Sequence, residues 1–275
     1  MIKKQWESLA ITVTFCFICN ALTTSLIPNA MKKLILLIVL VVMVCSSTVA
    51  HNIMFKHLEV RDGMPSNQIN SIYKDSRGFM WFGTASGLAR YDGYRFKVFY
   101  SSDNDPASLP NSYIEKITED GEGRLWIRTG ESGYVIYNWD TEDFVRDVRS
   151  YMWDIGIDGT PRFVFVDSQK NMWFAVDGKG CYRYRPGEKK AEVLSFGGKG
   201  MPEGIVMDIV ECKDGVVVVY DNGHVLCIDR EEVKVKWELT DIMKEMGTRT
   251  EIFFLYVDKD DDLWIYGAPG VWAYN

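Results

Sequence analysis

The stretch Asp75-Ser-Arg-Gly-Phe-Met-Trp81-Phe-Gly-Thr84, followed by Gly87-Leu-Ala-Arg-Tyr91-Asp-Gly93, decides the fold of this chain. An acidic residue stands six positions before a tryptophan, and short apolar and aromatic runs flank a turn. The same skeleton returns at Asp120–Trp126, Asp167–Trp173 and Asp258–Trp264, and in a degraded form at Glu211–Val217. Successive anchor positions 81, 126, 173, 217 and 264 are 45, 47, 44 and 47 residues apart. A period in the forties built from short strands is typical of β-propeller blades.

Each repeat predicts one four-stranded sheet, so the fold class is all-β. In the first repeat we expect strands over residues 68–73, 79–83, 88–91 and 95–100, joined by tight hairpins. The five predicted blades span about residues 68–100, 113–148, 162–194, 205–237 and 252–275. A strand-like run over Ile53–Val60 precedes them, and the one helix-like stretch is Asp241–Met246.

The recurring tryptophans are expected to be structural anchors of the repeats. They are Trp81, Trp126, Trp173 and Trp264, each in the predicted second strand of its blade. A single small sheet cannot bury both faces, so blades stack face to face and a large ring fills the space between them. A core position is therefore favoured over a sugar-stacking platform. Val217, which replaces the tryptophan in the fourth repeat, predicts a thinner contact there.

The N-terminal fifty residues have the features of a targeting region. Met31-Lys-Lys33, the apolar run to Val44 and the small residues up to Ala50 predict a signal peptide over residues 31–50. Residues 1–30 are then an over-extended N-terminus, and the blades occupy residues 51–275 of an exported, periplasmic protein. A membrane anchor over residues 8–27 is the competing interpretation, since that stretch approaches the required ~20 residues, although it is interrupted by polar side chains.

The charge of the chain argues against a nucleic-acid partner. The formal net charge is -7, and removal of residues 1–50 takes away four lysines and one glutamate, leaving 27 basic and 37 acidic residues, a net of -10. Such a surface repels phosphate backbones.

The exported part contains three cysteines, Cys181, Cys212 and Cys227, without a C-x-x-C motif. Small apolar residues in strands are the favoured interpretation over a metal or redox site. A bridge between Cys212 and Cys227, inside one blade, stays open.

The pattern Asp-x-x-Gly-x-x-Trp-x-Gly-Thr, followed by Gly-Leu-x-x-Tyr-Asp-Gly, resembles the two-component regulator propeller repeat. The opening segment Phe55–Asn67 resembles the start of the periplasmic sensor region of hybrid two-component systems. The resemblance covers residues 53–275 and is weakest in the fourth repeat. It implies an inner-membrane sensor of glycan breakdown products with seven-bladed propellers, followed by a transmembrane helix, histidine kinase, receiver and DNA-binding domain. It also implies partners: the remaining blades and kinase of the full-length sensor, an oligosaccharide ligand, and a homodimer in the full-length protein.

The sequence indicates no enzyme, cofactor or metal site. The histidines of the exported part are His51, His57 and His224, none in a phosphotransfer-like helix, and no glycine-rich ATP lid is present. Gly197–Gly200 has no following helix pattern, so it predicts a turn and not a phosphate-binding loop. Asp258–Asp262 lacks the glycine and glutamate of a calcium loop and predicts a solvated hairpin.

The candidate ligand-binding residues are Arg128, Tyr151 and Trp153. Arg128 takes the place of Gly83 near the second hairpin of repeat two, and the aromatic pair lies in a predicted inter-blade loop that ends at Asp158–Pro161. Aromatic faces stack on sugar rings, and Arg pairs with a uronate or sulfate. The structural alternative, a packed loop and a local ion pair, is favoured over a binding site.

Two function classes follow. The first is a non-catalytic sensor or binding module, and the second is a secreted propeller enzyme such as a lyase or a glycoside-active hydrolase. We expect five blades to form an incomplete, open part of a seven-bladed propeller. The alternative is a closed five-bladed ring in which Ile53–Glu59 supplies the last strand.

Overall fold

The computed structural model describes residues 55–194, 204–240, 242–245, 247, 252–268 and 270–274, together with Pro28 and Lys33. The chain divides into two compact units, Met1–His57 and Leu58–Asn275. Apart from Pro28 and Lys33, the predicted signal peptide and the alternative membrane anchor lie outside the described residues, as does the predicted turn Gly197–Gly200. Within the described ranges, no helix has the length and apolar character needed to cross a bilayer.

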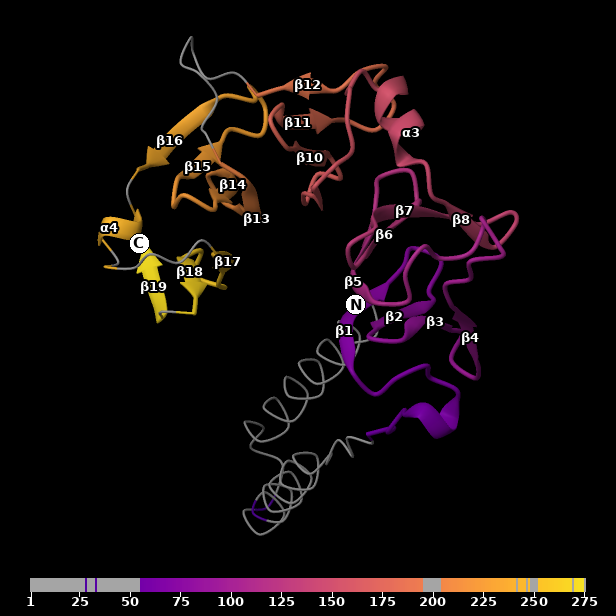
Figure 1. Cartoon of the computed structure of the whole chain (residues 1–275). Helices are drawn as coiled ribbons and strands as arrows, with labels where there is room; N and C mark the ends of the chain where they lie inside the picture. Colours follow the sequence, from indigo (N-terminus) through magenta and orange to yellow (C-terminus); the bar gives the residue numbers. More distant parts are fainter. Residues whose placement is uncertain are drawn as a thin grey trace. The chain divides into compact units, whose positions relative to one another are not determined.

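The second unit consists of five antiparallel sheets, here called sheets I to V, and the predicted all-β class is confirmed (Figure 1). Sheet I contains β1 (Ile69–Lys74), β2 (Met80–Thr84), β3 (Gly87–Tyr91) and β4 (Phe96–Phe99). Sheet II contains β5 (Ile114–Glu119), β6 (Leu125–Thr129), β7 (Gly133–Asn138) and β8 (Asp143–Val145). Sheet III contains β9 (Phe163–Val166), β10 (Met172–Val176), β11 (Gly180–Tyr184) and β12 (Glu192–Val193). Sheet IV contains β13 (Val206–Cys212), β14 (Gly215–Tyr220), β15 (Val225–Ile228) and β16 (Val235–Leu239). Sheet V has three strands, β17 (Phe254–Val257), β18 (Leu263–Gly267) and β19 (Gly270–Tyr274).

Among the described residues of this unit, three short helical segments accompany the sheets, and two of them correct the sequence analysis. The helix α3 (Val148–Asp154) replaces the predicted inter-blade loop, because Asp147 caps its first turn and Val148 and Met152 are buried on one face. The predicted strand over Ile53–Val60 is wrong in its described part, where residues 55–59 form no strand and η1 (Val60–Asp62) is a 3-10 turn. The helix α4 (Ile242–Glu245) lies within the predicted helical stretch.

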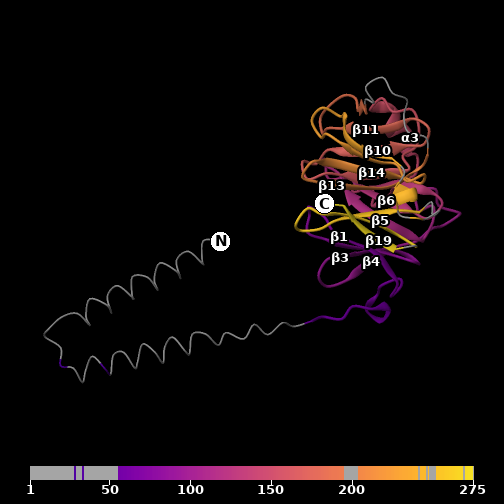
Figure 2. The same ribbon diagram turned by 90° about the vertical axis from the view of Figure 1, so that its left-hand side faces the viewer.

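The sheets follow one another in sequence order, with the first strands of successive sheets in contact. Figure 1 shows them along an open arc whose ends, sheets I and V, do not meet. Figure 2 shows the strands of successive sheets stacked in layers. The prediction of an open, partial propeller is therefore confirmed, and the alternative of a closed five-bladed ring is wrong.

The anchor tryptophans of sheets I to III are buried at the interfaces with the following sheets. Trp81 packs with Ile117 and Ile127 of sheet II, and Trp126 lies 5.7 Å from the Phe174 ring of sheet III. Trp173 shares a buried cluster with residues of sheet IV. Val217 fills the corresponding place between sheets IV and V and is fully buried. Trp264 of sheet V is only partly buried.

The acidic residue six positions before each tryptophan holds both the hairpin and the indole. In sheet I, Asp75 Oδ1 accepts hydrogen bonds from the backbone N–H groups of Arg77 (3.0 Å) and Phe79 (2.9 Å). Its other oxygen accepts from Trp81 Nε1 at 2.6 Å. The same set of bonds recurs at Asp120, Asp167 and Asp258. The six-residue spacing therefore follows from one side chain that must reach a turn and a ring together.

Sheet IV departs from this arrangement, which corrects the alignment of Glu211 with the anchor aspartates. Glu211 pairs with Val216, the residue before Val217, just as Glu119 pairs with Leu125, the residue before Trp126. The hairpin of sheet IV is therefore shorter by one residue, and Cys212 stands where Asp120 stands in sheet II. Without an indole N–H to satisfy, the acceptor is not needed.

These two glutamates each accept hydrogen bonds from a serine in the preceding sheet, and we call each such pair a serine–glutamate latch. Glu119 of sheet II accepts from the backbone N–H (2.9 Å) and the hydroxyl (2.7 Å) of Ser76 in sheet I. Glu211 of sheet IV accepts from the backbone N–H (2.7 Å) and the hydroxyl (2.7 Å) of Ser168 in sheet III. The interfaces I–II and III–IV are therefore built alike, at a spacing of two blades.

A buried or half-buried arginine reinforces each of these two interfaces. Arg90 of sheet I donates to Tyr137 Oη (3.0 Å) and pairs with Glu142 (2.7 Å) in sheet II. Arg183 of sheet III donates to the carbonyl of Glu231 (3.0 Å) in sheet IV. Both arginines are strand partners of an anchor tryptophan, Trp81 and Trp173.

Candidate functional site

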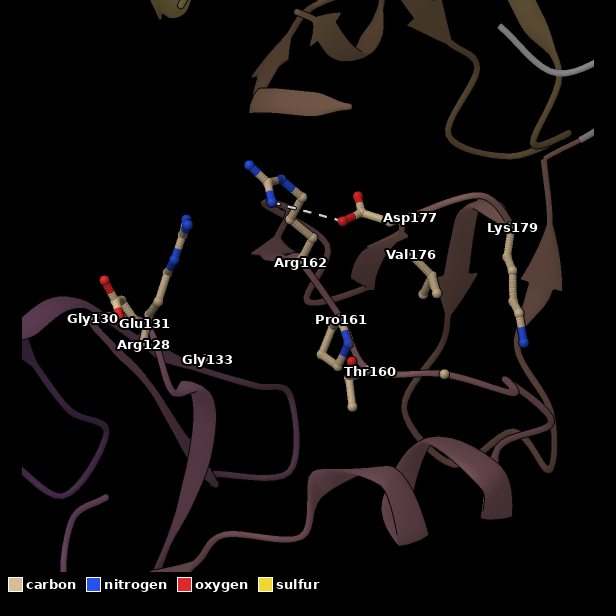
Figure 3. Close-up of a pocket in the computed structure, with 11 residues that line it drawn as sticks. Arg128, Gly130, Glu131, Gly133, Thr160, Pro161, Arg162, Val176, Asp177 and Lys179 are labelled. Carbon is tan, nitrogen blue, oxygen red and sulfur yellow. Dashed lines mark ion pairs between the residues drawn. The ribbon is translucent and has the colours of Figure 1, made fainter. Parts of the chain in front are cut away.

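A pocket of about 440 Å³ lies between sheets II and III. Its walls come from three connections: the β6–β7 turn, the segment that leads into β9, and the β10–β11 turn. These are the loops that enter an inner strand or join second and third strands, which share one face of a propeller. Figure 3 shows Arg128 on one side and Lys179 on the other, with Thr160, Pro161 and Arg162 between them.

Arg128 is placed in the pocket by its strand position. It pairs with Lys116 across the β5–β6 ladder, as Gly83 pairs with Ser71 in sheet I. A side chain at Gly83 would lie 2.7 Å from Ile114, whereas Arg128 has room to extend over the Phe163 ring, 4.8 Å from its centroid. Its Nε also pairs with Glu115 Oε2 at 2.8 Å. The ion pair and the ring fix the guanidinium in place.

Two further cations line the pocket, and the sequence analysis did not single them out. Arg162 Nη1 lies 3.7 Å from Asp177, and its Nε donates to the Val206 carbonyl at 3.3 Å. Lys179 Nζ donates to Asp158, at 2.6 Å from the carboxylate. Sequence signals for both were present, because Arg162 is the first residue of the predicted third blade and Lys179 stands in the Asp177–Gly180 turn.

The pocket presents acceptors as well as donors. Glu131 and Asp177 contribute carboxylates beside Arg128, Arg162 and Lys179. Neighbouring donors and acceptors of this kind suit a ligand with many hydroxyl groups, because each hydroxyl both donates and accepts. Across the described residues no group of three His, Cys, Asp or Glu side chains is arranged to hold a metal ion.

Tyr151 does not reach this pocket. Its ring packs edge-on against Trp126, with centroids 5.1 Å apart, and its hydroxyl accepts from Arg124 Nη2 at 2.9 Å. Burial raises the pKa of the Tyr151 hydroxyl above its ordinary value. Tyr151 therefore packs α3 against the core and does not line the pocket between sheets II and III.

Trp153 points the other way from α3 and is 67% exposed. It lines a shallower pocket of about 270 Å³ together with Asp147, Arg149, Ser150 and Asp154. The three predicted residues therefore lie apart: Arg128 lines the pocket between sheets II and III, Tyr151 packs against the core while partly buried, and Trp153 is exposed.

Asp158 connects the surroundings of the two pockets. Its carboxylate is 3.6 Å from Arg149 Nη2, a residue of the Trp153 pocket, and 2.6 Å from Lys179 Nζ, a residue of the Arg128 pocket. These two cations, Lys179 first, lower the pKa of the Asp158 carboxyl. Arg128 and Trp153 therefore lie in neighbouring pockets on either side of this carboxylate.

Two segments of the chain that match a known protein family coincide with the first two repeats. Residues 63–86 and 108–131 match the two component regulator propeller family. A stretch of 58 residues is 33% identical to Histidine kinase P4 from Formosa agariphila, covering 21% of this chain and 4% of that protein.

Solved structures with the same fold include two extracellular domains from B. thetaiotaomicron. The domain of BT3049, named as a hybrid two component system, has a TM-score of 0.57 at 20% identity and covers 80% of this chain and 30% of that chain. The domain of BT4673, named as a one component system, has a TM-score of 0.55 at 23% identity and covers 79% of this chain and 31% of that chain. The chain spans about a third of the length of these solved domains. The two stretches similar to the two component regulator propeller family therefore contain β1 and β2 of sheet I and β5 and β6 of sheet II, in a chain of five propeller blades.

Proposed function

We propose that the chain is the extracytoplasmic, ligand-binding propeller part of a hybrid two-component sensor that responds to glycan breakdown products. The observation that carries the proposal is the pocket between sheets II and III, on the face where loops from two blades converge. Its mixed donors and acceptors suit a saccharide, and the exposed Trp153 ring nearby offers a stacking surface. In the proposed whole protein, a kinase in the same polypeptide reads the binding event from the cytoplasm.

Binding without turnover is the expected behaviour of this chain. No step of bond cleavage is assigned to the pocket, whose three cations each already pair with a carboxylate. The proposal is tested by isothermal titration of the full chain with oligosaccharides from pectin, chondroitin sulfate and xylan, which supply uronate, sulfated and neutral probes. Each mixture is also analysed for new products and for ATP consumption.

The variants Arg128→Gln and Arg162→Gln should weaken binding of a positive probe by about 10-fold or more, since each removes a charge-assisted donor. Trp153→Ala should weaken it less, by about 3- to 10-fold, through lost stacking. Lys259→Gln makes the same charge change at a residue 88% exposed in the sheet V hairpin and should leave binding unchanged. Product formation, or equal affinity of all four variants, would contradict the proposal.

A further inference from the structure

A further pocket, of about 340 Å³, lies at the end of sheet I where β3 turns into β4, and we call it the hairpin pocket. It lies where β2 begins and β3 ends, whereas the pocket between sheets II and III lies where β6 ends and β7 begins. Because each blade repeats the same strand order, the two pockets lie on opposite faces of the propeller. The hairpin pocket is lined by three cations, one carboxylate and two phenylalanine rings: Arg90, Arg95, Lys97, Asp92, Phe79 and Phe96.

Two of the three cations share one carboxylate. Arg90 pairs with Lys97 across the β3–β4 ladder, so their side chains lie on one face of sheet I. Glu142 of sheet II lies 2.7 Å from Arg90 Nη2 and also pairs with Lys97. The hydrogen bonds from Lys97 and then Arg90 lower the pKa of the Glu142 carboxyl. Arg90 is further held by the Phe79 ring, 4.8 Å from the ring centroid, so it is a fixed wall of the pocket.

The third cation, Arg95, is exposed in the β3–β4 turn. Among the described residues, no carboxylate forms an ion pair with its guanidinium. The nearby Asp92 instead accepts hydrogen bonds from the backbone N–H groups of Tyr94 (2.8 Å) and Arg95 (2.7 Å), which hold the turn. With Glu142 included, three cations stand against two carboxylates, which leaves one positive charge in excess. Because residues 51–275 carry a net charge of -10, this local excess is opposite in sign to the rest of the unit.

The two phenylalanine rings give the hairpin pocket an apolar part. Both are half-buried. Phe79 stacks on Trp139 of sheet II, with ring centroids 6.1 Å apart, and Phe96 packs against Tyr91 at 4.7 Å. Rings fixed in this way are available to the C–H groups of a small ligand whose charged group reaches the cations.

We propose that the hairpin pocket binds an acidic saccharide through one anionic group, a carboxylate or a sulfate ester, with Arg95 and Lys97 as the donors. One excess positive charge matches one such group, and a guanidinium beside an ammonium suits its oxygens. A concave pocket of about 340 Å³ accommodates a sugar unit, whereas an acidic peptide would need cations spread along a surface. This is a second site, on the opposite face from the pocket of the proposed function, and it does not depend on that pocket.

The test is a titration of the full chain followed by saturation-transfer NMR of the ligand. The probes are galacturonic acid, a sulfated galactose and neutral galactose, with inorganic sulfate as a competitor. We expect both acidic sugars to bind about 10-fold or more tightly than galactose, since each gains charge-assisted hydrogen bonds. Inorganic sulfate should compete only weakly, because it makes no contact with the rings.

Variants assign the binding to this pocket. Arg95→Gln and Lys97→Gln should each weaken binding of the acidic sugars by about 10-fold. Lys259→Gln removes an exposed charge in sheet V, and Arg128→Gln alters the other pocket, so both should leave this binding unchanged. Failure of the function proposed for the other pocket is thereby distinguished from failure of this inference.

Glu142→Gln provides a readout that a folding defect cannot imitate. It removes the carboxylate that competes for Lys97, so binding of galacturonic acid should become about 3- to 10-fold tighter. Equal binding of acidic and neutral sugars, or unchanged affinity in both Arg95→Gln and Lys97→Gln, would overturn the inference. So would inorganic sulfate that displaces galacturonic acid at equal concentration, or a hexaglutamate peptide that binds where the sugars do not.

Discussion

At the scale of the residue, the aspartate of each repeat does more than the sequence analysis assigned to it. The regular spacing predicted that the tryptophans of the repeats are structural anchors. The chemical reason why each aspartate stands six residues before its tryptophan is that its carboxylate accepts hydrogen bonds from both the turn and the indole. The amino-acid sequence alone does not show which carboxylate oxygen accepts from which N–H group. The same limit explains why Glu211 was aligned with Asp120, although its strand pairing matches Glu119.

Removing one of these carboxylates should destabilise the fold. Asp75→Ala leaves the Trp81 indole N–H buried without an acceptor, so we expect the free energy of unfolding to fall by about 1–3 kcal/mol. Urea denaturation measures the change. Asp92→Ala is the matched control, because Asp92 accepts only backbone bonds in an exposed hairpin. An equal loss of unfolding free energy in both variants would show that the hydrogen bond to the buried indole is not the cause of the destabilisation.

Asp208 makes the stability of sheet IV depend on pH. Its carboxylate accepts from the backbone N–H groups of Ile209 (2.9 Å) and Leu255 (3.0 Å), yet burial outweighs these bonds and raises the pKa of Asp208. The folded protein therefore keeps this proton to a higher pH than the unfolded chain. The stabilising contribution of the group is present at low pH and is lost as pH rises through the folded-state pKa.

Asp208→Asn cannot ionise and should remove this dependence. The free energy of unfolding of the variant minus that of the wild type should increase as pH rises from about 3 to 7, then level off. Urea midpoints of the two proteins across that range provide the measurement. A difference that stays constant or decreases would show that the pKa is not raised.

At the scale of the element, the sheets were predictable and the connections were not. Period and turn chemistry place the strands of sheet I near their observed bounds, because local alternation decides which residues face a neighbouring blade. The helix α3 was missed because seven residues are too few for a helical period to stand out. That helix decides the candidate site, since it packs Tyr151 against Trp126 and exposes Trp153.

The two serine–glutamate latches should act independently. Ser76→Ala and Ser168→Ala each remove one hydroxyl donor, and we expect each to lower the free energy of unfolding by about 0.5–1.5 kcal/mol. Because the latches lie at different interfaces, the double variant should lose the sum of the two single losses. Denaturation of the three variants checks this; strong non-additivity would show that the interfaces I–II and III–IV are coupled.

At the scale of the whole unit, the fifth sheet leaves a large apolar face uncovered. Phe254, Tyr256 and Tyr266 are 41%, 58% and 40% exposed, on the face opposite the cluster shared with sheet IV. Tyr256 pairs with Trp264, whose equivalents in sheets I to III are buried by the next sheet. The period and the recurring tryptophans predicted the five blades, because neighbouring blades supply each other's cores. The open arc was expected from the resemblance to seven-bladed propellers, since the repeats alone allow a closed ring of five.

Site-directed disulfide crosslinking across the ends of the arc tests this account most directly. Ile72→Cys on sheet I and Tyr256→Cys on sheet V are combined in a chain whose native cysteines are replaced by serine; both positions are exposed, at 59% and 58%. In an open arc, mild oxidation should produce no crosslink within a monomer, and both thiols should remain available for alkylation. A closed five-bladed ring would bring the two faces together, so rapid formation of a crosslinked monomer would contradict the open propeller.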